Sequence, residues 1–331
     1  MTNEHSTENH SRPLLDWLLE KHPDTPRARA KEWIAAGRVS VDGVVIRQPH
    51  KPIPAPGDSL KLLDRQAATL DCGPTGLPIH EHLLLVHLDS SLAVVNKAAG
   101  LLSVPAPTGE LSALDILTAK LRTLPPVYRR LEPFVVHRID YYTSGLFCMA
   151  LNPTARANLI EQVRAHTMRR EYIAFVEGRP RQPKGTWRNW LKLNADETQQ
   201  TIVASAEPGA MESITHYEVI AEFPRAGVTK LRLRLETGRR HQIRIQAART
   251  GLPLIGDRMY HTHYRGRFPR QALHAELLCL VHPDLSAKAP ATAEQNRLVR
   301  QRLGEGGNMT FTAPLPEDMR RLEDMLKSGR V

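Results

Sequence analysis

The residues whose types and spacing suit chemistry fall in two stretches of the sequence. In the first, VVHRIDYYTSGL, Asp140 follows His137 and Arg138 at the edge of an apolar run typical of a buried strand. The second, LETGRRHQIRIQ, places Arg239, His241, Gln242 and Arg244 where a strand is expected to pass into a helix. The chemistry that these residues suggest is that of a carboxylate supported by cations.

A carboxylate that acts on a polyanion needs a positive partner. Phosphate repulsion and burial both raise the pKa of a carboxyl group, whereas an arginine salt bridge keeps it ionised and oriented. The segment between Pro224 and Gly251 is rich in arginine and lysine and contains a single acid, Glu236. These residues leave two interpretations open: Asp140 and an arginine join two strands, or Asp140 is catalytic.

The orientation of the basic segment depends on its backbone. If it begins extended, alternation places Gln242 and Arg244 on one face and His241 and Ile243 on the other.

Other common chemistries lack their sequence patterns. The glycines at residues 304–307 are not followed by the Lys-Ser/Thr of a P-loop, and no GxGxxG follows an expected strand. Ser144 lacks the GxSxG pattern of a nucleophile elbow. The HTH triplet at residues 261–263 has no acid or cysteine at metal-ligand spacing nearby, so we expect no metal.

The composition favours an anionic partner. The 331 residues include 45 Lys+Arg against 35 Asp+Glu, a formal net charge of +10, with 41% hydrophobic residues. Such an excess of cations is typical of proteins that bind RNA or DNA.

The sequence also indicates a location. The first residues are polar, and no apolar run approaches the length of a membrane span. The three cysteines, Cys72, Cys148 and Cys279, are far apart, which suggests a reducing compartment. We expect a cytoplasmic protein without membrane contact, and nothing indicates more than a monomer.

The residues before the catalytic candidates predict a small separate unit. An apolar stripe over residues 14–19 predicts a helix that ends at His22-Pro23, and Thr25-Pro26 begins a second helix that ends at Gly37. Asp42-Gly43 predicts a hairpin, and a further strand is expected over residues 59–63. This pattern resembles the S4 RNA-binding module.

The resemblance to the S4 module suggests an RNA-binding surface. Four cations lie on or just beyond the second helix: Arg27, Arg29, Lys31 and Arg38. They suit contacts to an RNA backbone, although a solvated charged face would explain each of them equally well.

The rest of the chain predicts a larger unit that contains Asp140. Strands dominate its second half without regular βα alternation, which indicates an α+β fold with a mixed, mainly antiparallel sheet. In VTKLRLRLETG, alternation places Leu231 and Leu233 on one face and Lys230 and Arg232 on the other. We expect a disordered arm at residues 1–11, the S4-like domain at 12–65, a linker at 66–80 and a catalytic domain at 81–325.

Several motifs decide between the two interpretations of Asp140. HRIDYYTSGL resembles the HRLDxxTSGL signature of the RluA-type pseudouridine synthase family, and LAVVNKAAGLLSVP, RREYIAFVEG, TGRRHQIRIQ, GLPLIGDRMY, RQALHAELLCLVHP and FTAPLPEDM resemble its other motifs in the same order. They cover about residues 83–320. The resemblance implies the pseudouridine synthase fold and the isomerisation of uridine to pseudouridine in RNA, without a cofactor or metal.

The same resemblance implies roles for particular residues. Asp140 falls on the essential aspartate of the family, Tyr172 on its active-site tyrosine and Arg244 on the arginine that pairs with the aspartate. Ile243 would form an apolar wall against the uracil, Arg138 would occupy the space of the flipped base, and His137 would orient the loop. The substrate-binding set is completed by Thr143, Arg239, His241 and Gln242.

The chain also departs from the family pattern. Tyr141 stands where basic or polar residues are more common, Ala98 replaces a proline, Gln246 replaces a histidine and Arg170 replaces a lysine. None of these changes removes a catalytic group, but together they suggest an unusual target.

The substrate and the activity have alternatives. By analogy with the S4 module we expect ribosomal RNA as the substrate, with transfer RNA as the alternative. A second hypothesis is a non-catalytic RNA-binding or ribosome-assembly factor on the same fold. A hydrolase that uses Asp140 as a base is a third, which the absence of a second acid at a comparable motif disfavours.

Overall fold

The computed structural model describes residues 11–35, 37–42, 44–62, 69–73, 75–196, 198–205, 207–264, 266–285 and 308–329. All but the last residue of the expected arm at 1–11 lies outside the described residues, as do Gly43 and residues 66–68 of the expected linker.

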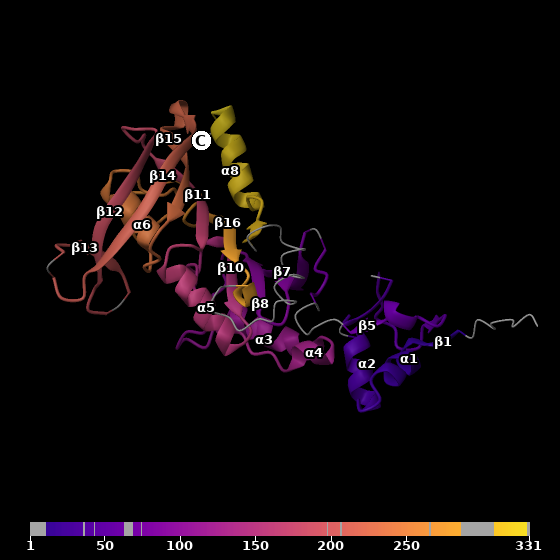
Figure 1. The fold of residues 1–331 in the computed structure, drawn as a ribbon. Coiled ribbons are helices and arrows are strands. Elements are labelled where there is room, and N and C mark those ends of the chain that lie inside the picture. Colours follow the sequence, from indigo (N-terminus) through magenta and orange to yellow (C-terminus); the bar gives the residue numbers. More distant parts are fainter. Residues whose placement is uncertain are drawn as a thin grey trace, which may run out of the picture.

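The first unit packs two helices against short strands. Helices α1 (Leu14–Lys21) and α2 (Arg27–Ala35) bury one apolar face each, centred on Leu18 and Ile34. Its strands are β1 (Arg12–Pro13), β2 (Val39–Val41), β3 (Val44–Val45), β4 (Pro52–Ile53) and β5 (Lys61–Leu62). The predicted hairpin is present as β2 and β3, with Asp42 in the left-handed region at φ 52°. Figure 1 shows this unit at one end of the molecule, beside α4 (Pro126–Arg129).

The second unit is built on one twelve-stranded sheet. Its first strands are β6 (Leu77–His80), β7 (Leu83–Leu88), β8 (Leu92–Lys97), β9 (Phe134–Val135) and β10 (Ser144–Ala150). The others are β11 (Arg169–Glu177), β12 (Lys184–Leu193), β13 (Gln200–Val203), β14 (Met211–Phe223), β15 (Val228–Leu235), β16 (Leu273–Val281) and β17 (Asn308–Thr312). The order is β13-β12-β14-β15-β11-β16-β10-β8-β7-β6, with β17 on β16 and β9 on β10. Strand β6 lies within the segment expected to be a linker.

The pairing confirms the predicted mixed, mainly antiparallel sheet. Strands β10 and β16 are parallel, and each of the other described pairs in this sheet is antiparallel. The predicted alternation in β15 is confirmed: Leu231 and Leu233 are fully buried in the main core, whereas Lys230 on the opposite face lies 2.8 Å from Glu323.

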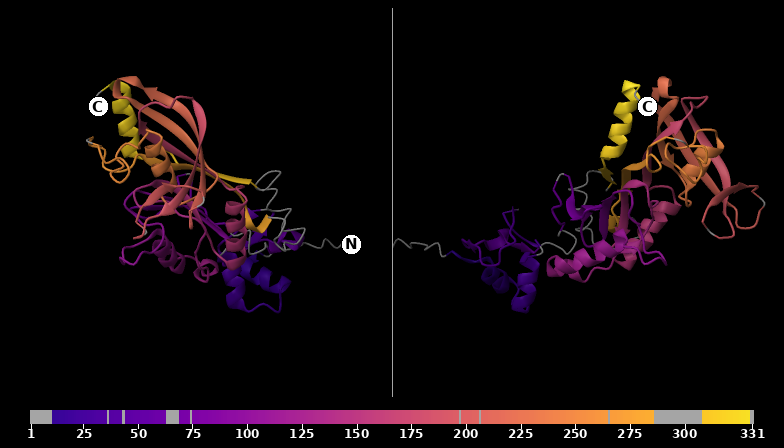
Figure 2. Two further views of the ribbon diagram at one scale, coloured as in Figure 1. Left: turned by 90° about the vertical axis from the view of Figure 1, so that its left-hand side faces the viewer. Right: turned by 180° about the vertical axis from the view of Figure 1, so that it is seen from behind.

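Helices cover both faces of the sheet (Figures 1 and 2). On one face, α3 (Ala113–Thr123) and α6 (Gln242–Arg249) pack into the core that contains Tyr172. On the other face, α5 (Pro153–Arg164) packs near β10, and the C-terminal helix α8 (Glu317–Ser328) packs against β11. Tyr172 therefore points to the same side of the sheet as α6.

Gly145 permits the parallel pairing of β10 with β16. Its φ of +114° lies outside the range that other residues readily adopt, and a Cβ atom there would collide with the backbone of Ala275 in β16. The glycine lets β10 approach β16 directly after the Asp140 loop, so the two halves of the sheet meet beside that loop.

Gly145→Ala is expected to lower the free energy of unfolding by more than about 3 kcal/mol, because the backbone of Ala275 must move to make room for the added Cβ atom. Gly109→Ala is the matched control, since its φ is +74° but nothing lies within 4 Å of its Cβ position. The control is expected to cost only the left-handed strain of about 1–2 kcal/mol. Chemical denaturation measures both, and equal losses would show that the close approach to Ala275 does not matter.

Candidate active site

The predicted residues of the second unit line one cavity. The cavity has a volume of about 470 Å³ and lies between the Asp140 loop, β11 and the start of α6. It is lined by every residue predicted there, from two distant stretches and one strand: His137, Arg138, Asp140, Thr143, Tyr172, Arg239, His241, Gln242, Ile243 and Arg244. The fold thus brings the carboxylate and the basic segment together.

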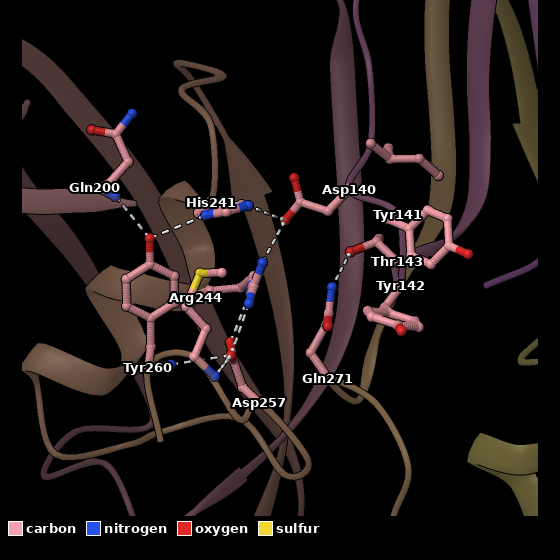
Figure 3. A network of polar contacts seen from close by, with 12 residues as sticks. Asp140, Tyr141, Tyr142, Thr143, Gln200, His241, Arg244, Asp257, Tyr260 and Gln271 are labelled. Carbon is pink, nitrogen blue, oxygen red and sulfur yellow. Dashed lines mark hydrogen bonds and ion pairs between the residues drawn. The ribbon is translucent and has the colours of Figure 1, made fainter. Parts of the chain in front are cut away.

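Asp140 projects from the loop between β9 and β10 with 19% of its side chain exposed. Its carbonyl accepts a hydrogen bond from the Thr143 amide at 3.0 Å, which closes the turn before β10. Its Oδ2 atom lies 3.4 Å from Arg244 Nη1 and 4.0 Å from His241 Nε2 (Figure 3). The carboxylate is therefore fixed at its base and open to the cavity at its tip.

Arg244 holds two carboxylates at once. Its Nε and Nη2 donate to the Asp257 carboxylate at 2.7 and 2.9 Å, and its remaining Nη1 reaches Asp140. Burial acts to lower the pKa of Arg244, but the hydrogen bonds and charges of Asp257 and Asp140 outweigh it and raise that pKa above its usual value. The guanidinium stays charged and is rigidly aimed by Asp257.

Asp257 is a site residue that the sequence reasoning missed. It is 1% exposed, and its Oδ1 also accepts hydrogen bonds from the backbone amides of Met259 and Tyr260 at 3.1 and 3.2 Å. The signal was available, since Asp257 lies in the motif GLPLIGDRMY. Without the fold, nothing connects that loop to Arg244.

His241 corrects the expectation of an extended start to this segment. It adopts a left-handed conformation at φ 54° and precedes α6, which begins at Gln242. Gln242 and Arg244 therefore do not share a face by strand alternation. The His241 Nδ1 atom lies 3.1 Å from the Tyr260 hydroxyl, and burial, with repulsion by Arg244, lowers the pKa of His241 to about 4.

The amide of Gln242 is used within the protein. Its Nε2 donates to the Ile214 carbonyl and the Thr215 hydroxyl at 3.1 and 2.9 Å, and its Oε1 accepts from Thr237 and the Arg239 amide. Because the side chain is 2% exposed and bonded to β14, it fixes the start of α6 beside the cavity.

Gln246, which departs from the family pattern, anchors the next turn of the same helix. Its fully buried amide donates to the Ser213 carbonyl at 3.0 Å and accepts from Thr215 at 2.6 Å. The substitution thus keeps α6 bonded to the sheet.

Apolar surface faces Asp140 across the cavity. Tyr172 and Ile243 are 5% and 4% exposed, and both belong to the main core. Burial raises the pKa of the Tyr172 hydroxyl, so this phenol is neutral at physiological pH. These side chains form a wall suited to a planar uncharged ring.

Arg138, Arg239 and His137 also line the cavity. Arg138 is exposed, whereas Arg239 is half-buried and donates from Nε to the Glu212 carbonyl at 3.3 Å. His137 Nε2 accepts a hydrogen bond from the Cys148 amide at 3.2 Å, and burial, with repulsion by Arg170, lowers the pKa of His137 to about 3. The neutral imidazole joins the loop to β10, and among the described residues its Nδ1 has no partner.

The predicted cations of the first unit divide into two kinds. Arg27, Arg29 and Lys31 are exposed on α2, with Arg27 3.2 Å from Asp16. Arg38 is 9% exposed and lies over the Trp33 ring at 5.3 Å. None of the four lines the cavity of Asp140.

Within the described ranges, no three His, Cys, Asp or Glu side chains are grouped so that they could hold a metal ion. The helices described here are also too short or too polar to cross a membrane.

Comparisons with known proteins match both units. The RNA pseudouridylate synthase family profile matches residues 91–249, and the S4 domain profile matches residues 12–60. The ribosomal large subunit pseudouridine synthase D of Yersinia pestis is 32% identical over 328 residues, which cover 94% of this chain and 90% of that protein. The uncharacterized RNA pseudouridine synthase YlyB of Bacillus subtilis (strain 168) is 32% identical over 98% of this chain and 97% of its own length.

The chain belongs to the RNA pseudouridine synthase family. A solved structure, human RNA pseudouridylate synthase domain containing 4, shares the fold with a TM-score of 0.55 and 18% identity, over 73% of this chain and 92% of that one.

The pseudouridine synthase is accordingly an isomerase that acts on RNA. In such a reaction the bond from C1′ to N1 of the uracil breaks and a bond from C1′ to C5 forms. The C5 proton leaves and N1 gains a proton, so the reaction is balanced without an oxidant or reductant.

Proposed function

We propose that this pseudouridine synthase modifies uridine in ribosomal RNA, with Asp140 as its essential catalytic group. The observation that carries the proposal is the Asp257–Arg244–Asp140 arrangement at the cavity, in which a buried guanidinium fixed by one carboxylate reaches a second, partly exposed one. The Arg244 guanidinium would orient Asp140 and offset the negative charge of an RNA strand beside it.

The uracil enters the cavity as a flipped base. The ring would lie against Tyr172 and Ile243, with the ribose at Asp140, so that the carboxylate either attacks C1′ or removes the 2′ proton. Tyr172 would stack on the flipped ring, with its hydroxyl placed to help remove the C5 proton.

The exposed Arg138 would enter the space left by the extruded base. His137 and Thr143 would hold the loop, and Arg239 and His241 would contact the substrate near Asp140. The contacts of Gln242 support a positioning role for that residue.

The relatives support ribosomal RNA as the substrate. Several are named ribosomal large subunit pseudouridine synthase D, including those of Yersinia pestis and Escherichia coli. We further infer that the enzyme needs no metal or cofactor, since proton transfers and one covalent rearrangement complete the reaction. We also infer that it is a cytoplasmic monomer.

Purified protein incubated with unmodified large-subunit rRNA and with unmodified tRNA tests the substrate. Pseudouridine is expected at a specific position of the rRNA, as measured by nucleoside analysis of the digested RNA. Modification of tRNA alone would overturn the rRNA assignment and leave the reaction in place.

Removing the exposed cations of α2 is expected to weaken RNA binding. The triple variant with Arg27→Ala, Arg29→Ala and Lys31→Ala should bind RNA with a weaker salt dependence. The slope of the logarithm of the RNA association constant against the logarithm of the salt concentration should become shallower by up to about 3, since each phosphate contact contributes about 0.7–0.9. The matched control removes three cations from α8, Arg320, Arg321 and Lys327, which lies far from the S4-like unit in Figure 1. Equal effects of the two triple variants would contradict an RNA-binding role for α2.

A further inference from the structure

A second cavity lies on the other side of Asp140. Its volume is about 390 Å³, and it shares Asp140, His241 and Arg244 with the first cavity. The lining includes Tyr141 and Tyr142, the two residues that directly follow the catalytic candidate. The second cavity thus adjoins the proposed site of chemistry but is not needed to hold the uracil.

The side chains of this cavity suit a nucleotide. The Tyr142 side chain is 51% exposed, and its ring meets that of Tyr141 edge-on at 4.7 Å (Figure 3). Two exposed arginines, Arg240 and Arg258, also line the cavity. An open aromatic face beside guanidinium groups is the combination that binds single-stranded nucleic acid, because every base stacks and every phosphate is negative.

The backbone that carries the two tyrosines is held by two buried basic side chains. Lys97, which is fully buried, donates from Nζ to the Tyr141 carbonyl at 3.0 Å, and the Gly100 amide donates to the same oxygen at 3.0 Å. Arg270, 5% exposed, donates from Nη1 to the Tyr142 carbonyl at 3.0 Å.

Arg270 is itself fixed by the C-terminal helix. Its Nε and Nη2 donate to the two carboxylate oxygens of Asp318 in α8 at 2.7 and 3.0 Å. A bidentate pair of this kind restrains the guanidinium in position and orientation. The tyrosines are therefore presented on a rigid backbone, as in a binding site formed before the ligand arrives.

The covalent structure of the RNA substrate determines which of its nucleotides can reach this cavity. A target uridine is joined to a neighbour on each side, and its ribose lies at Asp140 when its base fills the first cavity. A cavity that shares Asp140 with the first therefore lies within one phosphodiester of the target.

We propose that the second cavity binds the nucleotide directly adjoining the target uridine, with its base on Tyr142 and its phosphate at Arg240 and Arg258. This inference rests on the proposed function. It gives Tyr142, together with Tyr141, which departs from the family pattern, the role of selecting the sequence context of the target.

The test uses a synthetic RNA centred on the uridine that the enzyme modifies, and two versions in which the 5′ or the 3′ neighbour is abasic. Tyr142→Ala is expected to lower kcat/KM on the intact RNA by about 10- to 100-fold, the usual effect of losing one stacked base. On one of the abasic RNAs, wild type and Tyr142→Ala should be equally slow. Tyr142→Phe should behave like wild type.

Leu111→Ala is the control, because Leu111 is as exposed as Tyr142, at 51%, but lines neither cavity. It should leave kcat/KM unchanged on every RNA. An equal fold loss for Tyr142→Ala on intact and both abasic RNAs, or no loss on intact RNA, would overturn the inference alone. A wild type that forms no pseudouridine in intact RNA would overturn the proposed function and the inference together.

Discussion

Asp140→Asn is expected to lower the rate of pseudouridine formation by on the order of 10³-fold or more, since it removes the one group placed to react with the ribose or its 2′ proton. The amide keeps nearly the same shape but can neither attack C1′ nor accept that proton. Single-turnover measurements with saturating enzyme isolate this chemical step from binding.

The same variant should fold and bind RNA like wild type. The Asp140 tip is partly exposed, and Arg244 keeps its stronger pair with Asp257, so no buried charge loses its main partner. Thermal unfolding and RNA binding provide the controls. Turnover within tenfold of wild type would remove Asp140 from the mechanism.

Arg244→Met is expected to affect both turnover and stability. The free energy of unfolding should fall by about 3–5 kcal/mol, because the substitution leaves the buried Asp257 carboxylate without its cation. Turnover should fall by about 10²-fold or more, because Asp140 loses the guanidinium that orients it.

A second variant separates the two effects. Arg244→Met combined with Asp257→Asn removes the uncompensated charge, so chemical denaturation should show much of the lost stability restored. Turnover should stay low, since nothing replaces the guanidinium at Asp140. Recovery of turnover together with stability would show that Arg244 serves the fold only.

The sequence predicts much of the fold because its patterns are local. The two helices of the first unit form where their apolar stripe and proline cap predict them, β15 has the predicted alternation, and the hairpin at Asp42 forms as its turn residues require. The exception is the start of α6, where the left-handed His241 is set by contacts to β14 and Tyr260 that no local pattern contains.

The sequence likewise predicts some residues of the candidate site and not others. Asp140 and Arg244 could be paired from charge and motif order, but Asp257 could not, because its connection to Arg244 exists only after the loop and α6 pack together. Lys97 and Arg270 were likewise missed, since their partners are backbone carbonyls of the Asp140 loop, which carry no sequence signal.

The tyrosines after Asp140 show most clearly what the sequence alone does not predict. In the sequence, Tyr141 is only a departure from a family pattern, and nothing distinguishes Tyr142. The structure places them in a cavity that shares Asp140, His241 and Arg244 with the proposed uracil site, where they acquire a testable role.

Mapping pseudouridine in the RNA of cells that lack the gene shows whether this chain converts uridine to pseudouridine through Asp140. At least one site should be lost on deletion, wild type should restore it, and Asp140→Asn should not. Restoration of the site by Asp140→Asn to the wild-type level would show that the reaction does not depend on this carboxylate.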